Sequence, residues 1–459
     1  MKVIVANRSD TEITLKKSIL VRLAVIYFAC WFATFYELPL GIRVALILLM
    51  VINQLLSFYS SIVFFLMALM VPFIADMFND MVQGLDPYRF MFFPFLFYAI
   101  SQKKIRDFPF NNKLCFFILI SLVLLQASSA YQILVRNMPL NEENRPIDVL
   151  ALVYDNFIKV AFLYFIFTRL GYKELQNVLV LFVFLIVMEA ASLIHMSYIH
   201  RDLLTRISSD SILWINPYFG HKNEWSFVFV FIFLIALLKS LEQGPMNWFW
   251  HSAVGIIVLA IAVSLSRQAY VWTIMAFIIT AYYKKNSKIL VYMAIGGLLL
   301  LIVQPAFLFE RMEAMVSSSS TEEFQELNSK VGDEAIDQFI QNFRFVPQMF
   351  VQEWEYNHSE GFWNGFLHQQ GILGLFFIFY IYFFAFNRFK FFYACNNKVL
   401  TTYAIYGMVA IILMFVANLN RRHTHFMHYK GEIGEIGLFM MFMILLSEVT
   451  YRKLVKDQE

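Results

Sequence analysis

Residues 175–197 read LQNVLVLFVFLIVMEAASLIHMS, a run that is apolar at most positions. An α-helix needs about 20 predominantly apolar residues to cross the hydrocarbon core of a bilayer. The run therefore predicts a transmembrane helix. It carries two ionisable residues, Glu189 and His195, inside the predicted span.

The same length criterion marks apolar runs along the whole chain. The other runs are residues 19–36, 40–57, 61–78, 88–100, 114–135, 149–168, 223–238, 249–265, 268–283, 289–308, 371–388, 400–417 and 434–450. They predict an all-α, polytopic membrane protein with about 14 transmembrane helices, in a range of roughly 12–14.

Composition supports a membrane protein and excludes several other classes. Hydrophobic residues make up 60% of the 459 residues and charged residues 15%, whereas soluble domains are about half apolar and about a quarter charged. A soluble enzyme and a disordered chain are thereby excluded. The net charge of +3 and the lack of a long basic run give no sign of nucleic-acid binding. Cys30, Cys115 and Cys395 lie far apart, which fits neither a zinc site nor a disulfide framework.

The basic residues near the ends of the runs predict both termini in the cytoplasm, since Lys and Arg favour that side. The N-terminal polar segment leads into a run that we interpret as a retained anchor. The predicted organisation is a cytoplasmic tail (1–18), helices 1–11 (19–308), a large outer loop (309–370), helices 12–14 (371–450) and a cytoplasmic tail (451–459). Within the loop, Glu322 to Phe345 has apolar residues at helical spacing and predicts an amphipathic helix.

Many basic residues nevertheless fall on the predicted outer side. They are Arg201, Arg206, Lys222, Arg267, Arg344, Arg421, Arg422 and Lys430. Their clustering favours an anionic ligand outside. The alternative is ordinary snorkelling of juxtamembrane side chains towards water.

The first candidate cluster is YFGHKNEW at 218–225, where a polar segment enters an apolar run. It places His221, Lys222 and Asn223 at a helix N-terminus. Free backbone N–H groups and the positive end of the helix dipole favour an anion there. The alternative is an interfacial anchor that belongs to an aromatic belt.

The second cluster is SLSRQ at 264–268, a polar patch between two apolar runs. Ser266 and Arg267 would lie near the outer surface. The planar guanidinium of arginine suits bidentate phosphate binding. The alternative is a tight helical hairpin without a ligand.

The third cluster, EWEYNHSEG at 353–361, closes the outer loop. His358 and Glu360 are candidate proton acceptors, because histidine titrates near neutral pH and carboxylates accept protons. His368 is the alternative base. The sequence GILG at 371–374 then opens the next predicted helix.

The fourth cluster is NRRHTHFMHYK at 420–430. Its histidines lack the helical spacing of metal ligands, and the adjacent Arg421 and Arg422 oppose a cation. We therefore expect anion binding and no metal. Neutralisation of these charges by Glu432 and Glu435 is the alternative.

Two charged residues lie inside a predicted span. Asp155 and Lys159 stand four residues apart on one helix face, where they can neutralise each other. A proton or ion path is the alternative, because ionisable residues inside membranes often mark such paths. Together with Glu189 and His195, they keep a transporter open as a function.

The order of these elements resembles the O-antigen ligase and Wzy-type polymerase superfamily of bacterial surface polysaccharide assembly. The resemblance covers roughly 215–390: GHKN at a helix start, SLSR after the next helix, a large outer loop with NHS, and GxxG at a helix start. The gap between Ser359 and Gly371 is longer than in the family, and another alignment places Trp363 and Asn364 at the loop motif.

The resemblance implies a GT-C-like fold in the bacterial inner membrane and an active site that faces the periplasm. It implies a glycan donor on undecaprenyl pyrophosphate, with Lys222 and Arg267 at the pyrophosphate and His358 as the base. Such an energised donor needs no nucleotide, and we expect no cofactor or metal. An acceptor hydroxyl would displace the pyrophosphate with inversion at the anomeric carbon.

The sequence favours a polymerase, which joins lipid-linked repeat units. A ligase, which transfers the glycan to a lipid core, and a transporter or flippase of lipid-linked sugar are the alternatives. Expected partners are the lipid-linked oligosaccharide and the bilayer, and the resemblance adds a flippase and a chain-length regulator.

Overall fold

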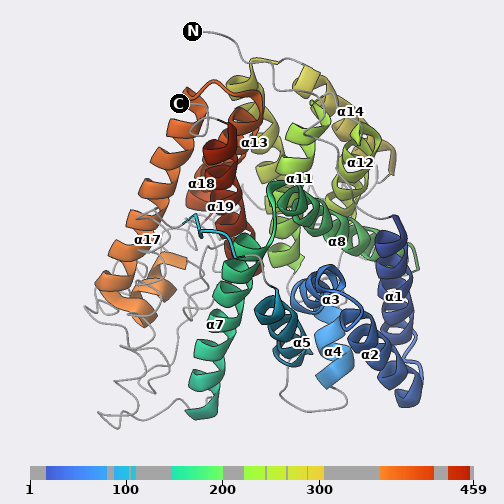
Figure 1. The fold of residues 1–459 in the computed structure, drawn as a ribbon. Helices are drawn as coiled ribbons and strands as arrows, with labels where there is room; N and C mark the ends of the chain where they lie inside the picture. Colours follow the sequence, from blue (N-terminus) through green and yellow to red (C-terminus); the bar gives the residue numbers. More distant parts are fainter. Residues whose placement is uncertain are drawn as a thin grey trace. The chain divides into compact units, whose positions relative to one another are not determined.

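The computed structural model of the chain describes residues 17–79, 87–102, 105–109, 146–199, 222–242, 246–264, 267–286, 288–303, 362–417 and 433–454. Within these ranges the regular structure is α-helical, and no strand occurs there (Figure 1). The predicted all-α class is confirmed at this level.

The chain divides into two compact units that are interleaved in sequence. Unit 1 comprises residues 1–109, 158–270 and 445–459, and unit 2 comprises 110–157 and 271–444. Helices wholly in unit 1 are α1 (Lys17–Phe35), α2 (Leu40–Gln54), α3 (Phe58–Met70), α4 (Pro72–Asn79), α5 (Pro87–Ser101), α8 (Tyr172–Ile199), α11 (Lys222–Ser240) and α12 (Asn247–Val263). Unit 2 holds α14 (Lys288–Val303), α17 (Phe362–Ala394) and α18 (Lys398–Ala417), and residues of α7 (Pro146–Arg169), α13 (Arg267–Lys284) and α19 (Glu435–Leu454) belong to both.

Four described helices are long and apolar enough to cross a membrane. They cover Ser18–Phe35, Tyr172–Ile199, Gly371–Ala394 and Lys398–Phe415. Shorter apolar helices cover Leu40–Gln54, Phe58–Met70, Ser226–Ser240 and Asn247–Val263. Together they make the chain a helical membrane protein, while the count of about 14 spans and the GT-C-like fold remain predictions.

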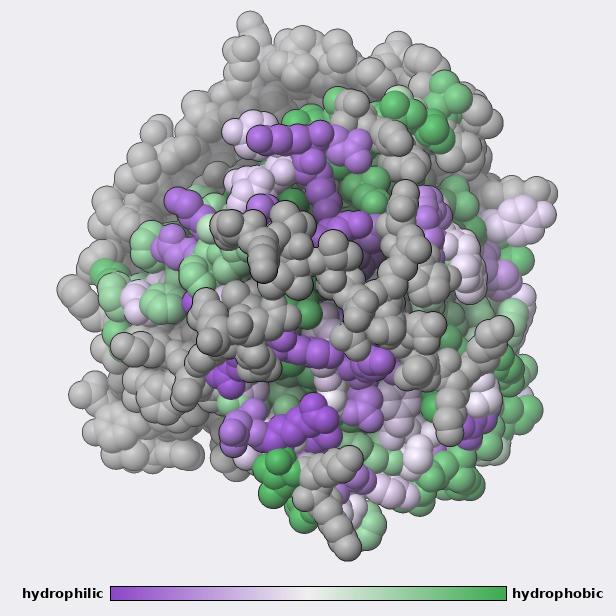
Figure 2. Space-filling model, turned by 45° about the horizontal axis from the view of Figure 1, so that its top comes forward, coloured by the Kyte–Doolittle hydropathy of each residue, from purple (hydrophilic) through white to green (hydrophobic). Residues whose placement is uncertain are grey.

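The helices differ in how much apolar surface they bury. In α11, the residues from Phe227 to Leu238 are all buried, as expected of a helix that is apolar all round. In α2, by contrast, Leu40, Leu48 and Ile52 are about half exposed or more. Figure 2 shows both hydrophilic and exposed hydrophobic side chains on one face of the molecule. Exposed apolar helix faces of this kind suit contact with lipid.

Two predicted runs end differently in the structure. The run 61–78 is interrupted between α3 and α4, where Val71 is extended and Pro72 begins α4. Proline lacks an N–H donor and disfavours helical geometry in the residue before it, so the helix breaks there. The run 371–388 starts at a backbone break within α17, at Gly371, and its helical segment continues beyond the run to Ala394. The run 114–135 lies outside the described residues.

α17 and α18 pack so closely in unit 2 that residue 407 must be glycine. A β-carbon at Gly407 would overlap the ring of Phe389 on α17. We therefore expect Gly407→Ala to destabilise the protein by about 1–3 kcal/mol, the usual cost of overpacking, and to lower its melting temperature in detergent.

Gly255→Ala is the matched control, because a β-carbon at this glycine on α12 meets nothing within 4 Å. Its melting temperature should equal or slightly exceed that of the wild type, since alanine favours helix more than glycine does. A Gly407→Ala protein that melts like the Gly255→Ala protein would contradict this packing.

Candidate functional site

A buried hydrogen bond joins the second turn of α11 to the end of α12 in unit 1. The Ser226 hydroxyl donates to Ser264 Oγ at 3.0 Å, and Ser264 Oγ donates to the carbonyl of Ile261 at 2.8 Å. Ser226 is fully buried and Ser264 is 2% exposed. Each hydroxyl is thus satisfied within an apolar contact, where an unmade hydrogen bond would be costly.

This serine pair brings two of the predicted clusters together. α11 begins at Lys222, one turn before Ser226, and α13 begins at Arg267, three residues after Ser264. The described residues of the GHKN and SLSR elements, at the starts of α11 and α13, therefore lie at the same end of the packed α11–α12 pair. The side chains of Lys222, Asn223 and Arg267 are outside the described set, whereas their backbone is helical.

A tyrosine further fixes the turn between α12 and α13. The Tyr270 hydroxyl donates to the carbonyl of Ala262 at 2.5 Å. This bond ties the first turn of α13 to the last turn of α12. Tyr270 was not among the residues predicted from the sequence, where its position three residues after Arg267 was the available signal.

The arrangement has a direct electrostatic consequence. The N-terminal turns of α11 and α13 both start at this end of unit 1, and each presents N–H groups without an intrahelical acceptor. Each also contributes the positive end of a helix dipole. Two such turns, with Lys222 and Arg267 at their first positions, suit a polyanion such as pyrophosphate.

The remaining predicted site residues lie outside the described residues. They are Arg201, His221, Ser266, Arg344, His358, Glu360, Arg421 and Arg422. The predicted amphipathic helix from Glu322 to Phe345 is also outside the described ranges. The structure thus places the starts of α11 and α13 at one end of unit 1, whereas the role of His358 as the base stays a prediction.

The GILG element coincides with a backbone break inside α17. Gly371 has φ of 65° and ψ of −175°, a conformation that is essentially restricted to glycine. A new helical segment therefore starts at the GxxG motif, as predicted, although the residues just before it are helical too. Trp363, Asn364 and His368 lie in that preceding segment, and their side chains are outside the described set.

The charged pair of the transporter alternative is buried in α7. Asp155 is 5% exposed, Lys159 is 4% exposed, and Asn156 between them is equally buried. Asn156 Oδ1 accepts a hydrogen bond of 2.8 Å from the backbone N–H of Ile433, within unit 2. Ile433 is the first described residue after the predicted basic cluster at 420–430, and the polar turn of α7 binds its backbone. Asn156 was not among the residues predicted from the sequence.

Glu189 and His195 lie on α8 beside α1 in unit 1. The indole N–H of Trp31 donates to His195 Nδ1 at 3.4 Å, and Ser192 donates to the hydroxyl of Tyr27 at 3.2 Å. Glu189 is fully buried and close enough to Tyr27 to interact with it electrostatically. Because indole is only a donor, His195 Nδ1 is an acceptor, and a neutral ring carries its proton on Nε2.

The described residues contain no group of three His, Cys, Asp or Glu side chains arranged to hold a metal ion. The histidines at 423, 425 and 428 are not among them.

No protein-family model matches the chain, and a search of curated proteins finds no match. The function is therefore inferred from the residues and contacts described above.

Proposed function

We propose that the chain is a membrane glycosyltransferase that joins undecaprenyl-pyrophosphate-linked repeat units of a bacterial surface polysaccharide. The observation that carries this proposal is the Ser226–Ser264 hydrogen bond, which places the starts of α11 and α13 together. In the proposed enzyme, Lys222, Asn223 and Arg267 bind the pyrophosphate of the donor at the periplasmic face of the inner membrane.

Contacts within each unit support the predicted alternation of the spans, and they do so whichever end faces the periplasm. Six hydrogen bonds join segments that the alternating topology assigns to one side. At predicted outer ends they are Trp31–His195, Ser226–Ser264 and Asn156–Ile433. At predicted inner ends they are Arg106–Thr168, Arg452–Pro109 and Lys284–Thr402. If the predicted number of spans between two partners were wrong by one, or by any odd number, the topology would place the two partners on opposite sides of the membrane.

The proposed reaction is a single displacement. A hydroxyl oxygen of the acceptor sugar forms a bond to the anomeric carbon of the donor, and the bond from that carbon to the pyrophosphate oxygen breaks. The electron pair leaves with the lipid pyrophosphate, while His358 or Glu360 takes the hydroxyl proton. Arg267 and Lys222 stabilise the negative charge that develops on the leaving group.

The test is an assay with the purified protein and one lipid-pyrophosphate-linked repeat unit as both donor and acceptor. A polymerase yields a ladder of glycan lengths on a gel. Transfer that occurs only after a lipid core is added would identify a ligase instead. Intact substrate under both conditions would refute the proposed glycosyltransferase activity and favour the transporter alternative.

The transporter alternative has a specific observation in its favour, the buried Asp155 and Lys159 of α7. If these residues form a translocation path, Asp155→Asn or Lys159→Met should impair flipping of lipid-linked sugar in reconstituted vesicles. Unchanged flipping in both variants would eliminate this alternative.

A further inference from the structure

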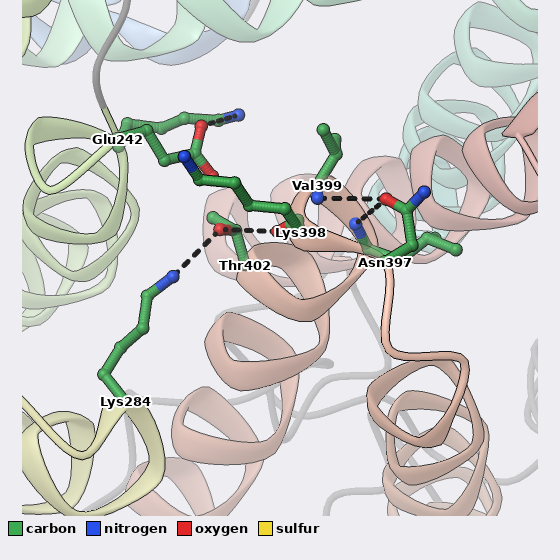
Figure 3. A network of polar contacts seen from close by, with 8 residues as sticks. Glu242, Lys284, Asn397, Lys398, Val399 and Thr402 are labelled. Carbon is green, nitrogen blue, oxygen red and sulfur yellow. Dashed lines mark hydrogen bonds and ion pairs between the residues drawn. The ribbon is translucent and has the colours of Figure 1, made fainter. Parts of the chain in front are cut away.

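Two hydrogen bonds in unit 2 gather the C-terminal ends of α13 and α17 and the start of α18. Tyr393 on α17 donates to the carbonyl of Tyr283 on α13 at 3.4 Å, and the two rings meet edge to face. Lys284 Nζ donates to Thr402 Oγ1 on α18 at 3.3 Å (Figure 3). The first turn of α18 is itself capped by Asn397, whose Oδ1 accepts from the N–H groups of the two residues after Lys398.

The ends of α13 and α17 carry a group of cations that we call the unit 2 cationic patch: Lys284, Lys285, Arg388 and Lys390. Lys285 and Lys390 are exposed, and Lys284 and Arg388 are half-buried. The Arg388 guanidinium lies 4.6 Å from the ring centre of Phe391 and 4.8 Å from that of Phe392. Such stacking holds the charge near the end of α17.

The segments that bear the patch contain no acidic residue. The sequence has no Asp or Glu between Glu242 and Glu310, and none between Glu360 and Glu432. The acidic residues in the described part of unit 2 lie on other helices, in the first half of α7 and the first turn of α19. The helices that carry the patch therefore provide no carboxylate of their own to neutralise it.

Exposed apolar faces lead directly to the two exposed lysines. On α13, the face runs through Val271, Ile274, Ile278 and Tyr282, and the exposed Lys285 follows the end of the helix directly. On α17, Phe376, Phe379 and Phe383 are exposed, and Lys390 continues that face. Each face thus ends in a cation, the pattern expected where acyl chains meet phosphate headgroups.

We propose that the unit 2 cationic patch binds the phosphate headgroup of an anionic phospholipid whose acyl chains lie along α13 and α17. The apolar faces favour a lipid over a soluble phosphate, which would make no use of them. The lysine ammonium groups and the guanidinium supply the charge that distinguishes an anionic from a zwitterionic headgroup. The proposal is independent of the glycosyl-transfer reaction, and each can fail without the other.

The test is native mass spectrometry of the full chain in neutral detergent, titrated with phosphatidylglycerol or phosphatidylcholine. We expect tighter binding of phosphatidylglycerol to the wild type. Removal of one cation should weaken the binding of phosphatidylglycerol about fivefold. The affinity of the double variant Lys285→Gln/Lys390→Gln should therefore be about 25-fold lower than that of the wild type. Binding of phosphatidylcholine should not change.

Lys173→Gln is the matched control, since Lys173 is also exposed, lies in the first turn of α8 in unit 1 and precedes Glu174. It should bind phosphatidylglycerol like the wild type, and Lys285→Arg/Lys390→Arg should retain binding because it keeps the charge. Unaltered phosphatidylglycerol affinity in the double glutamine variant would overturn the proposal. Competition by soluble glycerol phosphate at equal concentration would overturn the lipid assignment in favour of a simple phosphate site.

Discussion

Replacement of Arg267 by alanine is expected to reduce glycan transfer about 10²–10³-fold, the usual cost of removing one group that stabilises transition-state charge. Arg267 is the first residue of α13 and lies three residues after Ser264, which accepts a hydrogen bond from Ser226, one turn into α11. The guanidinium would offset charge that appears on pyrophosphate only as the sugar leaves. The rate of ladder formation from one lipid-linked repeat unit measures this effect.

Two further variants sharpen the Arg267 prediction. Arg267→Lys should recover little activity, since an ammonium group cannot make the bidentate contact. Arg22→Ala is the matched control, because the Arg22 guanidinium donates a hydrogen bond to the carbonyl of Ser18 within its own helix, α1. An Arg267→Ala protein that reaches the membrane and polymerises at the wild-type rate would remove Arg267 from the site.

Replacement of His358 by alanine is expected to reduce the rate about 10²–10⁴-fold, the range that general-base assistance provides. An imidazole accepts a proton only when it is neutral, so wild-type activity should fall as the pH drops below neutrality. The His358→Ala variant should be slower, and its remaining activity should no longer fall as the pH drops, so the acid limb of the profile is absent. A pH–rate profile of both proteins therefore separates loss of a base from mere loss of folding.

His251→Ala controls for the removal of a histidine, because His251 is exposed on α12 and its Nδ1 lies 2.8 Å from the carbonyl of Asn247. It should keep both the rate and the pH profile. A His358→Ala protein with an unchanged acid limb would transfer the role of base to Glu360 or His368.

The helical elements near the site were predictable because their signal is local. The runs 223–238, 249–265 and 268–283 match α11, α12 and α13 to within about two residues. Apolar length alone determines such elements. The break at Pro72 was visible in the sequence too, but a criterion based on hydropathy gives no weight to a missing N–H donor.

The pairing of distant segments was not predictable in the same way. Ser226 and Ser264 are ordinary small polar residues in apolar runs, and nothing in their spacing indicates that their hydroxyls meet. The same holds for Asn156, whose partner Ile433 is far away in sequence. These contacts, and the interleaving of the two units, arise from packing between helices, which a single sequence does not encode as a periodic pattern.

The central claim is that the starts of α11 and α13 bind one pyrophosphate. The direct measurement is the affinity of the purified protein for undecaprenyl pyrophosphate, taken for the wild type, Lys222→Ala, Arg267→Ala and the double variant, with undecaprenol as the uncharged control. Each single change should weaken binding about 10- to 100-fold, the worth of a charge-assisted hydrogen bond. The double variant should lose less affinity than the product of the two single losses, because residues that share a binding partner are coupled. Single variants that bind like the wild type, or fully multiplicative losses, would contradict a shared pyrophosphate site.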